Sequence, residues 1–331
     1  MKAAVHYQYG PPEVVSIQEV PKPVPGANDI LVKVYASTVN RTDCGFRSAV
    51  YVISRLFSGL FKPKNPILGC EFAGIVEETG SAVTYFKKGD RVFGYNDQQF
   101  GGHAEYLVVP YTGMVAIIPD HLGFKEAAPL TEGAHYALNI IRASKIRKGE
   151  KALVYGASGA IGSAAVQLLK QLGVTVTAVC GTKNLGLLRS LGADTVIDYQ
   201  TEDFTQTIDR FPFIFDAVGK SSFGQCKPLL TPKGVYVSTE LGKGAENVFL
   251  AIIGKLRGGR RVLFPIPENK REDILFLREL AASGAFTPVI DRSYPLDQIV
   301  EAYTYVETAQ KTGNVVLDIC NGYEIPKLKI S

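Results

Sequence analysis

A glycine-rich turn near the middle of the chain is the first segment whose residue types could do chemistry. Residues 155–162, Tyr-Gly-Ala-Ser-Gly-Ala-Ile-Gly, have the spacing G-x-x-G-x-x-G and stand between an apolar run and a helical pattern. Glycines let the backbone approach a pyrophosphate closely, and the free N–H groups at the start of the following helix favour an anion. Because the spacing departs from G-x-G-x-x-G, the glycines could instead serve only a tight strand-to-helix turn.

A second informative segment begins about 20 residues further on. In NAD-binding sites an acidic residue at this distance holds the ribose 2′-hydroxyl at the end of the second strand. Here the corresponding residues are Cys180-Gly181-Thr182-Lys183-Asn184, without an acid. Thr182 and Lys183 offer a hydroxyl and a positive charge to a 2′-phosphate, although Lys183 could equally be a solvated lysine in the first turn of a helix. We therefore expect NADPH rather than NADH.

Both segments lie in a region where apolar runs alternate with helical patterns. We expect six strands, at residues 152–155, 174–180, 195–197, 213–215, 234–237 and 262–265, with helices such as 161–172 and 185–191 between them. Continuous apolar strands separated by helices are typical of a parallel sheet covered on both faces. Six such strands would complete a dinucleotide-binding sheet.

The remainder of the chain has a different pattern. Short β-rich runs divided by Pro and Gly, at residues 30–36, 71–77, 91–94, 104–109 and 114–118, predict a barrel-like lobe. Beyond about residue 270, two amphipathic helices at 271–283 and 296–307 and a strand at 314–319 do not extend the six-strand series. We therefore predict an α/β protein with two domains, one formed by residues 1–124 and 268–331 and the other by residues 125–267.

Composition excludes several classes of protein. The chain has 331 residues, of which 46% are hydrophobic and 21% charged, as in ordinary globular proteins. Its formal net charge of +4 is dispersed, and the densest cationic stretch, 255–261, is interrupted by glycines, so we expect no nucleic-acid partner. No apolar run approaches the length of a membrane span. Five cysteines far apart in sequence suit a reducing compartment, and we expect a cytoplasmic protein.

Several motifs, in order along nearly the whole chain, resemble the medium-chain dehydrogenase/reductase superfamily, and specifically its zinc-independent quinone-oxidoreductase-like branch, which includes enone reductases. They stand at residues 1–3 (MKA), 40–43 (NRTD), 69–74 (GCEFAG), 89–92 (GDRV), 156–162, 191–194 (LGAD) with 197–199 (IDY), and 215–219 (FDAVG). The resemblance implies a GroES-like substrate domain joined to a Rossmann domain with a doubly wound, six-stranded parallel sheet. It places the active site between the domains, and we also expect a homodimer.

The resemblance also bears on zinc. Alcohol dehydrogenases of the family hold a catalytic zinc with Cys, His and Cys, where this chain has Asn40, Cys70 and approximately Leu130. The cysteine cluster of the family's structural zinc is missing too, and no C-x-x-C spacing occurs. Cys44, Cys70 and His103 could meet in an improvised site, but residues at such spacings more often serve packing. We therefore expect no metal.

Without zinc, the favoured reaction is hydride addition to a quinone or to the β-carbon of an α,β-unsaturated carbonyl, because hydrogen bonds can hold the oxyanion that develops. The resemblance makes Asn40 the first candidate donor and places Thr131 beside the nicotinamide. Tyr51 is a candidate substrate-facing phenol. The alternatives are that Asn40 ends a strand, that Thr131 caps a helix and that Tyr51 is an exposed loop residue.

The predicted cofactor residues come from the two segments and from the resemblance. They are Ser158, Gly159, Ala160 and Ile161 at the turn, Thr182 and Lys183 at the 2′-phosphate, Tyr199 near the adenosine phosphate, Val218 and Gly219 after the fourth strand, Phe264, Pro265 and Ile266 at the nicotinamide end, and Asn314 near the tail. Those drawn from the resemblance could instead be packing or turn residues. Glu71, His103, Glu132 and His135 are further polar candidates, but solvent could also supply the proton that the reaction needs.

The sequence leaves three functions open. The main hypothesis is an NADPH-dependent, zinc-free reductase of quinones or α,β-unsaturated carbonyls. A carbonyl or alcohol dehydrogenase of the same superfamily is the nearest alternative. A cofactor-binding structural or interaction protein is the third, although such a protein would need neither the phosphate turn nor Lys183.

Overall fold

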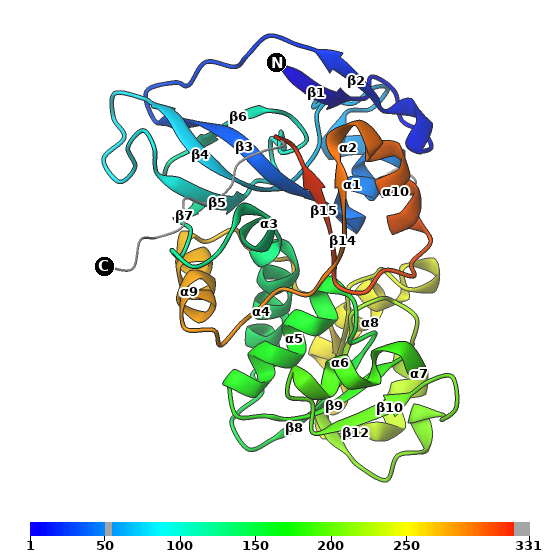
Figure 1. Cartoon of the computed structure of the whole chain (residues 1–331). Coiled ribbons are helices and arrows are strands. Elements are labelled where there is room, and N and C mark those ends of the chain that lie inside the picture. The colour runs from blue at the N-terminus through cyan, green and yellow to red at the C-terminus, as the bar shows by residue number, and fades with distance from the viewer. Residues whose placement is uncertain (50–54, 321–331) are drawn as a thin grey trace. The chain divides into compact units, whose positions relative to one another are not determined.

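The computed structural model describes residues 1–49 and 55–320, and the chain divides into two compact units (Figure 1). The first unit comprises Met1–Glu132, Asn269–Ala282 and Ile290–Ser331, and the second comprises Gly133–Glu268 and Ser283–Val289. The domain boundaries expected from the sequence remain a prediction. No helix within the described residues is long and apolar enough to cross a membrane.

The first unit is built around a seven-stranded sheet. Its strands are β3 (Asp29–Val39), β4 (Glu71–Thr79), β5 (Arg91–Tyr95), β6 (Tyr106–Pro110), β7 (Met114–Ile117), β14 (Ile290–Pro295) and β15 (Asn314–Asp318). They follow the order β14-β15-β3-β4-β5-β7, and β6 also pairs with β3. All these pairs are antiparallel except β14 with β15. A smaller antiparallel pair, β1 (Lys2–Val5) with β2 (Ser16–Glu19), completes the β structure of this unit.

The C-terminal strand lies beside the strand that leads to Asn40. In the register of β15 with β3, Val315 is opposite Val39 and Val316 is opposite Thr38. The tail therefore joins the sheet of the first unit, and the expectation that it does not extend the parallel series is confirmed.

Helices of the first unit begin and end at positions that local chemistry explains. They are α1 (Arg41–Ser48), α2 (Arg55–Ser58), α3 (Phe124–Ala127), α9 (Arg271–Ala282) and α10 (Ile299–Glu307). Asn40 and Asp43 form a reciprocal capping box at the start of α1, and the helix ends at Ala49, whose φ is +44°. This cap fixes where the chain leaves β3.

The second unit contains an all-parallel, six-stranded sheet. Its strands are β8 (Lys151–Tyr155), β9 (Thr175–Cys180), β10 (Thr195–Asp198), β11 (Phe211–Asp216), β12 (Leu230–Ser238) and β13 (Arg261–Leu263), in the order β10-β9-β8-β11-β12-β13. Its helices are α4 (Glu132–Ser144), whose first residue belongs to the first unit, α5 (Ala160–Gln171), α6 (Leu185–Ser190), α7 (Phe223–Cys226) and α8 (Glu246–Arg257). This is the doubly wound order of a dinucleotide-binding fold, as predicted.

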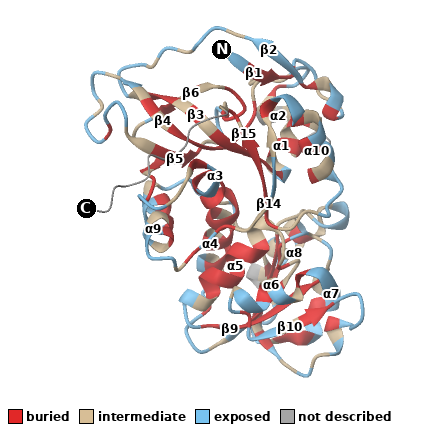
Figure 2. Cartoon of the chain, viewed as in Figure 1, coloured by how far each residue is buried: buried red, intermediate tan, exposed pale blue. Residues whose placement is uncertain are grey.

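The last strand of this sheet is shorter than expected. Pairing with β12 ends at Leu263, which is opposite Val237, so Phe264 and Pro265 fall beyond the strand. Pro265 has no N–H to donate to a ladder, which accounts for an end at this point. Figure 2 shows buried residues concentrated in the strands of both units, and Leu153 and Ile214 of the parallel sheet are fully buried.

Candidate functional site

In the second unit, the glycine-rich turn has a shape that only glycine allows at two positions. Gly156 has φ of +71°, and a Cβ there would lie 2.4 Å from Val218 Cγ2. A Cβ on Gly162 would lie 2.3 Å from the Gly156 carbonyl oxygen. The turn therefore packs against the segment after β11, and it brings the candidates Val218 and Ser158 to one end of the sheet.

The helix that follows the turn begins without a side-chain cap. α5 starts at Ala160, and its N-cap, Gly159, has no side chain to accept from the first amides. The first N–H groups of a helix have no partner within the helix, and the helix dipole is positive at this end. A Cβ on Gly159 would meet only the Gly156 oxygen, at 3.6 Å, so the space beside this residue is open. The predicted phosphate residues 158–161 thus have the geometry of an anion cradle.

Asp216, at the end of β11, holds the neighbouring loop. Its Oδ1 accepts hydrogen bonds from the amides of Val218 at 3.1 Å and Gly219 at 2.8 Å. Its Oδ2 accepts from the Ser221 amide at 2.7 Å and from the Ser221 hydroxyl at 2.8 Å. Sequence reasoning did not single out Asp216 as a functional residue, although it stands in the 215–219 motif. An acid directly after a buried apolar strand was the available signal.

The ends of β9 and β10 meet at the predicted 2′-phosphate position. The Thr182 hydroxyl lies 2.5 Å from Asp198 Oδ2 and 2.7 Å from Gln200 Oε1, so it already has acceptors within the protein. No acid ends β9, as expected, but β10 brings Asp198 beside Thr182. Lys183 is exposed, and Tyr199 is 52% exposed, with its phenol oxygen 3.3 Å from where a Cβ on Gly181 would lie. The structure thus brings Tyr199, which follows β10, close to the turn after β9 that carries Thr182 and Lys183.

The remaining cofactor candidates lie elsewhere. Phe264, Pro265 and Ile266 follow β13 in the second unit, and Ile266 is 82% exposed. Asn314 opens β15 in the first unit and is buried. Tyr51 lies outside the described residues.

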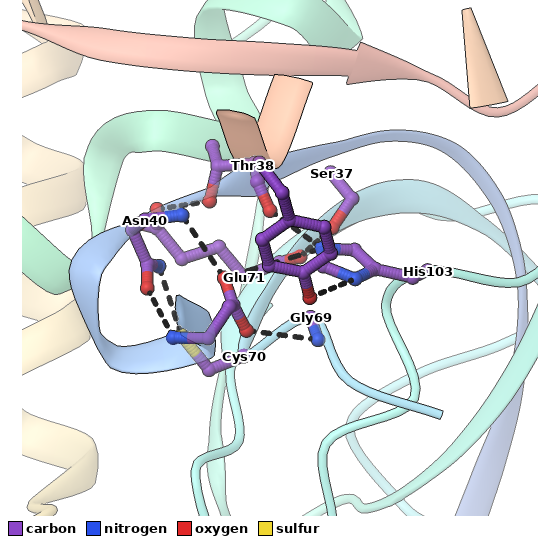
Figure 3. A network of polar contacts seen from close by, with 9 residues as sticks. Ser37, Thr38, Asn40, Gly69, Cys70, Glu71 and His103 are labelled. Atoms are coloured by element: carbon purple, nitrogen blue, oxygen red, sulfur yellow. Dashed lines mark hydrogen bonds and ion pairs between the residues drawn. The ribbon is translucent and has the colours of Figure 1, made fainter. Parts of the chain in front are cut away.

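Asn40 stands in a buried polar network of the first unit (Figure 3). Its Oδ1 accepts from the Asp43 amide at 3.0 Å, and its Nδ2 donates to Cys70 Sγ at 3.1 Å. Local capping, the alternative that the sequence left open, is therefore present. The cap uses only the Asn40 oxygen. The side-chain amide also has two N–H groups, of which Cys70 accepts from one, so the second remains able to donate to another partner.

Glu71 is the centre of hydrogen bonding in this network. Its Oε2 accepts from the Thr38 hydroxyl at 2.6 Å, and its Oε1 accepts from the Thr131 amide at 3.1 Å, the Thr131 hydroxyl at 2.7 Å and the Glu132 amide at 2.6 Å. Burial raises the pKa of Glu71, while these donors act against the rise. Because its hydroxyl proton is directed at Glu71, Thr131 presents an acceptor oxygen to any other partner.

His103 is held in a structural position within the same network. Its Nε2 lies 2.7 Å from the Thr38 carbonyl oxygen, which accepts only from a protonated nitrogen. Burial lowers the pKa of His103 to about 4, so the ring is neutral near pH 7. Asp43 accepts from the Gly69 amide at 3.0 Å, and burial raises its pKa to about 7. His135 belongs to the second unit, where Asn139 contacts its Nδ1 at 3.2 Å.

The network brings Asn40 and Cys70 into contact. Cys44, Cys70 and His103 do not join in a metal site. Within residues 1–49 and 55–320, no three or more His, Cys, Asp and Glu residues are grouped so as to hold a metal ion. Burial raises the pKa of Cys44 to about 12 and that of Cys70 well above its usual value, so both are thiols rather than thiolates at neutral pH.

Two family models match the chain. A zinc-binding dehydrogenase model covers residues 191–317, and an alcohol dehydrogenase GroES-like domain model covers residues 26–120. A 2-methylene-furan-3-one reductase of Solanum lycopersicum is 32% identical, with 96% of this chain and 79% of that protein covered. A chloroplastic NADPH-dependent alkenal/one oxidoreductase of Arabidopsis thaliana is 30% identical, with 98% of this chain and 80% of that protein covered.

The fold has close counterparts among solved structures. The quinone oxidoreductase from Coxiella burnetii aligns with a TM-score of 0.86 and 28% identity, over 97% of this chain and 99% of that one. The chain belongs to the medium-chain dehydrogenase/reductase superfamily. It is an oxidoreductase with a GroES-like domain and an NAD(P)-binding Rossmann domain.

Proposed function

We propose that this protein is an NADPH-dependent, zinc-free reductase of quinones or α,β-unsaturated carbonyls. The observation that carries the proposal is the Asn40–Cys70 pair, in which a buried amide donates to a thiol at 3.1 Å. The resemblance implies that both residues stand where zinc-dependent relatives have metal ligands. A neutral amide and a thiol of raised pKa are poor ligands, but the amide is a good hydrogen-bond donor to an oxyanion. The names of the two plant relatives agree with this chemistry.

The residues of the second unit fit the cofactor. The glycine turn and the uncapped start of α5 would hold the pyrophosphate, since a Cβ at Gly156 or Gly162 would close the turn. Lys183 and Tyr199 would contact the 2′-phosphate, with the Thr182 hydroxyl turned toward Asp198 instead. Bound NADPH supplies the hydride. Phe264, Pro265 and Ile266 are proposed for its nicotinamide end, and Asn314 near the tail as a further cofactor residue, on the resemblance alone.

The protein's own groups would then manage the charge on the substrate. The second N–H of Asn40 would donate to the carbonyl oxygen of the substrate as negative charge develops there. Thr131, whose proton is directed at Glu71, would accept a hydrogen bond from the nicotinamide amide. A positioned donor of this kind typically contributes about 2.7 to 4 kcal/mol to the stabilisation of the transition state.

A substrate screen tests the proposal. The protein would be given NADPH with a quinone, an acyclic enone, an aldehyde or a ketone. Reduced nicotinamide absorbs at about 340 nm, so the fall in this absorbance reports hydride transfer. Turnover of the quinone or the enone supports the proposal. Turnover restricted to the aldehyde or ketone would instead support a carbonyl dehydrogenase, and cofactor binding without any turnover would support a structural role.

Two further expectations, a homodimer and a cytoplasmic location, stay predictions. Exposed apolar side chains on α8 of the second unit offer a surface for self-association. Phe249 and Ile252 are 63% and 60% exposed there, and Ile253 of the same helix is 41% exposed. Large contiguous apolar patches on a protein surface often mark sites of protein contact.

A further inference from the structure

Two buried glutamates meet at the start of α4, and their hydrogen bonding differs. Both oxygens of Glu71 are engaged by four hydrogen bonds, from Thr38, Thr131 and the Glu132 amide. The carboxyl group of Glu132 instead faces the Thr42 hydroxyl. Glu132 is 5% exposed and Glu71 is fully buried, so both carboxyl groups are largely removed from water and Glu132 is the less engaged of the two.

Titratable groups from several segments face the Glu132 carboxyl. Glu71 on β4 and Asp43 on α1 oppose its ionisation, whereas Lys311, between α10 and β15, favours it. The Cys70 thiol, just before β4, also lies in its field. Two neighbouring buried carboxyl groups do not both ionise readily, and the four donors on Glu71 assign the negative charge to Glu71. Burial and the Glu71 charge accordingly raise the pKa of Glu132 well above its usual value.

The Glu132 carboxyl and the Asn40 amide lie at the same end of α1. Asn40 is the N-cap of this helix and Thr42 is its second residue. Asn40 donates to Cys70, and among charged neighbours Glu132 has the largest effect on the Cys70 thiol. The Glu132 carboxyl group, whose pKa is raised, therefore lies at the same helix start as the amide that the proposed function assigns to the substrate oxygen.

We propose that Glu132 is the general acid that protonates the α-carbon of an α,β-unsaturated carbonyl after hydride addition. This inference rests on the proposed function and names its proton donor. Glu132 is thereby a catalytic residue, while Glu71 is a positioning residue that keeps the proton on its neighbour and holds Thr131.

The step balances in atoms and charge. Hydride from NADPH forms a C–H bond at the β-carbon, the C=C π electrons move to form an enolate, and NADPH is oxidised to NADP⁺. The Asn40 amide donates to the enolate oxygen. The Glu132 O–H bond breaks, its proton bonds to the α-carbon, and the carbonyl is restored. The resulting Glu132 carboxylate is stabilised by Lys311 and by the positive end of α4 until water returns a proton.

Substrate choice gives this idea a sharp test. Reduction of a quinone places the new negative charge on oxygen, which water protonates rapidly, whereas the enolate α-carbon needs a positioned acid. An enone with an α-methyl group also acquires a stereocentre at the protonated carbon. Glu132→Gln keeps the shape and removes the proton, and Glu126→Gln, on the exposed face of α3, is the matched control.

We expect Glu132→Gln to lower kcat for the α-methyl enone by about 10²- to 10⁴-fold, the usual range for a general acid. Its ratio of enone to quinone turnover should fall about 10²-fold, and its residual product should be racemic at the α-carbon, while the NADPH dissociation constant stays near wild type. Glu126→Gln should match wild type throughout. In wild type and in Glu132→Asp, kcat should fall at high pH as the acid ionises, which keeps the test open if Glu132→Gln does not fold.

Two results would overturn the inference. One is a Glu132→Gln protein that reduces the enone at the wild-type rate to a single enantiomer. The other is a wild-type and Glu132→Asp pH profile without a high-pH decline in enone turnover. If the wild-type protein reduces neither enone nor quinone, the proposed function itself fails, so that failure is told apart from a wrong assignment of Glu132.

Discussion

Asn40 has two roles in the structure, and suitable substitutions separate them. Its Oδ1 caps α1 by accepting from the Asp43 amide, and its Nδ2 donates to Cys70 and, in the proposed mechanism, to the substrate oxygen. Asn40→Ala removes both roles. Asn40→Ser keeps a good N-cap acceptor but lacks the amide donor, because its short side chain does not extend to Cys70.

The magnitudes of the two losses differ enough to be distinguished. Loss of an N-cap costs about 0.5 to 2 kcal/mol of stability, so Asn40→Ala should melt a few degrees below wild type, while Asn40→Ser should melt near it. Loss of an oxyanion donor costs about 2.7 to 4 kcal/mol, so both variants should lose about 10²- to 10³-fold in kcat. Asn40→Asp should be slower still, because it brings an anion against the developing oxyanion.

The assay pairs thermal melting with steady-state kinetics on the best substrate of the screen, and NADPH binding is the control. The NADPH dissociation constant should change little, because the Asn40 side chain contacts Asp43 and Cys70 rather than the glycine turn. If Asn40→Ser retains near-normal kcat while Asn40→Ala loses only stability, Asn40 serves only as a helix cap and is not a catalytic residue.

Four other changes test the remaining assignments. Lys183→Ala should erase most of the preference for NADPH over NADH, about ten- to hundredfold in affinity, and equal dissociation constants in the unaltered protein would already refute the assignment. Metal analysis should find no stoichiometric zinc, and chelators should leave turnover unchanged; one tightly held zinc whose removal abolishes activity would contradict this. Asp216→Asn turns an acceptor oxygen into a donor facing the Ser221 amide, so NADPH affinity should fall about tenfold or more. If calorimetry shows unchanged affinity, Asp216 is not needed to hold the loop for NADPH binding. The pKa of His103 is about 4 in the fold against 6.5 for an ordinary histidine, so the unfolded chain binds more protons between these values. Stability should therefore fall as pH falls through that window, by roughly 3 kcal/mol from this group. His103→Gln can still donate to Thr38, and it should flatten the dependence of the denaturant midpoint on pH. If that dependence is unchanged, His103 is not its source.

Sequence predicted the parallel sheet well because its signals are local. Strands covered on both faces read as continuous apolar runs, and the turn at 155–162 separates β8 from α5 within a few residues. The error at β13 also has a local cause, since residues 264–265 continue the apolar run although Pro265 cannot donate to the ladder. Asp198 stands in the 197–199 motif, but its place beside Thr182 could not be predicted because it ends β10, one strand away from the segment after β9.

The buried network could not be predicted in the same way, because its bonds join distant residues. Thr38 and Glu71 are 33 positions apart, Glu71 and Thr131 are 60 apart, and His103 and Thr38 are 65 apart. No periodicity or spacing in one sequence reports such pairs. The capping box of Asn40 with Asp43 is the exception, since an N-cap and its N3 partner are three residues apart and can be recognised from sequence.

Two helix N-termini explain how the first unit tolerates so many buried acids in one place. α1 begins beside Asp43, whose carboxylate accepts from the backbone amide of Asn40. α4 begins beside Glu71, which accepts from the backbone amides of Thr131 and Glu132. Unpaired amides at a helix start need acceptors, and the dipole there stabilises negative charge, so each acid satisfies a requirement of the backbone. Neighbouring groups are oriented in turn: the Asp43 backbone amide donates to the Asn40 side chain, and the Glu71 carboxylate accepts from the Thr131 hydroxyl. Preorganised donors and acceptors of this kind are what the proposed metal-free hydride transfer would require, because no strong Lewis acid would compensate for a misplaced hydrogen bond.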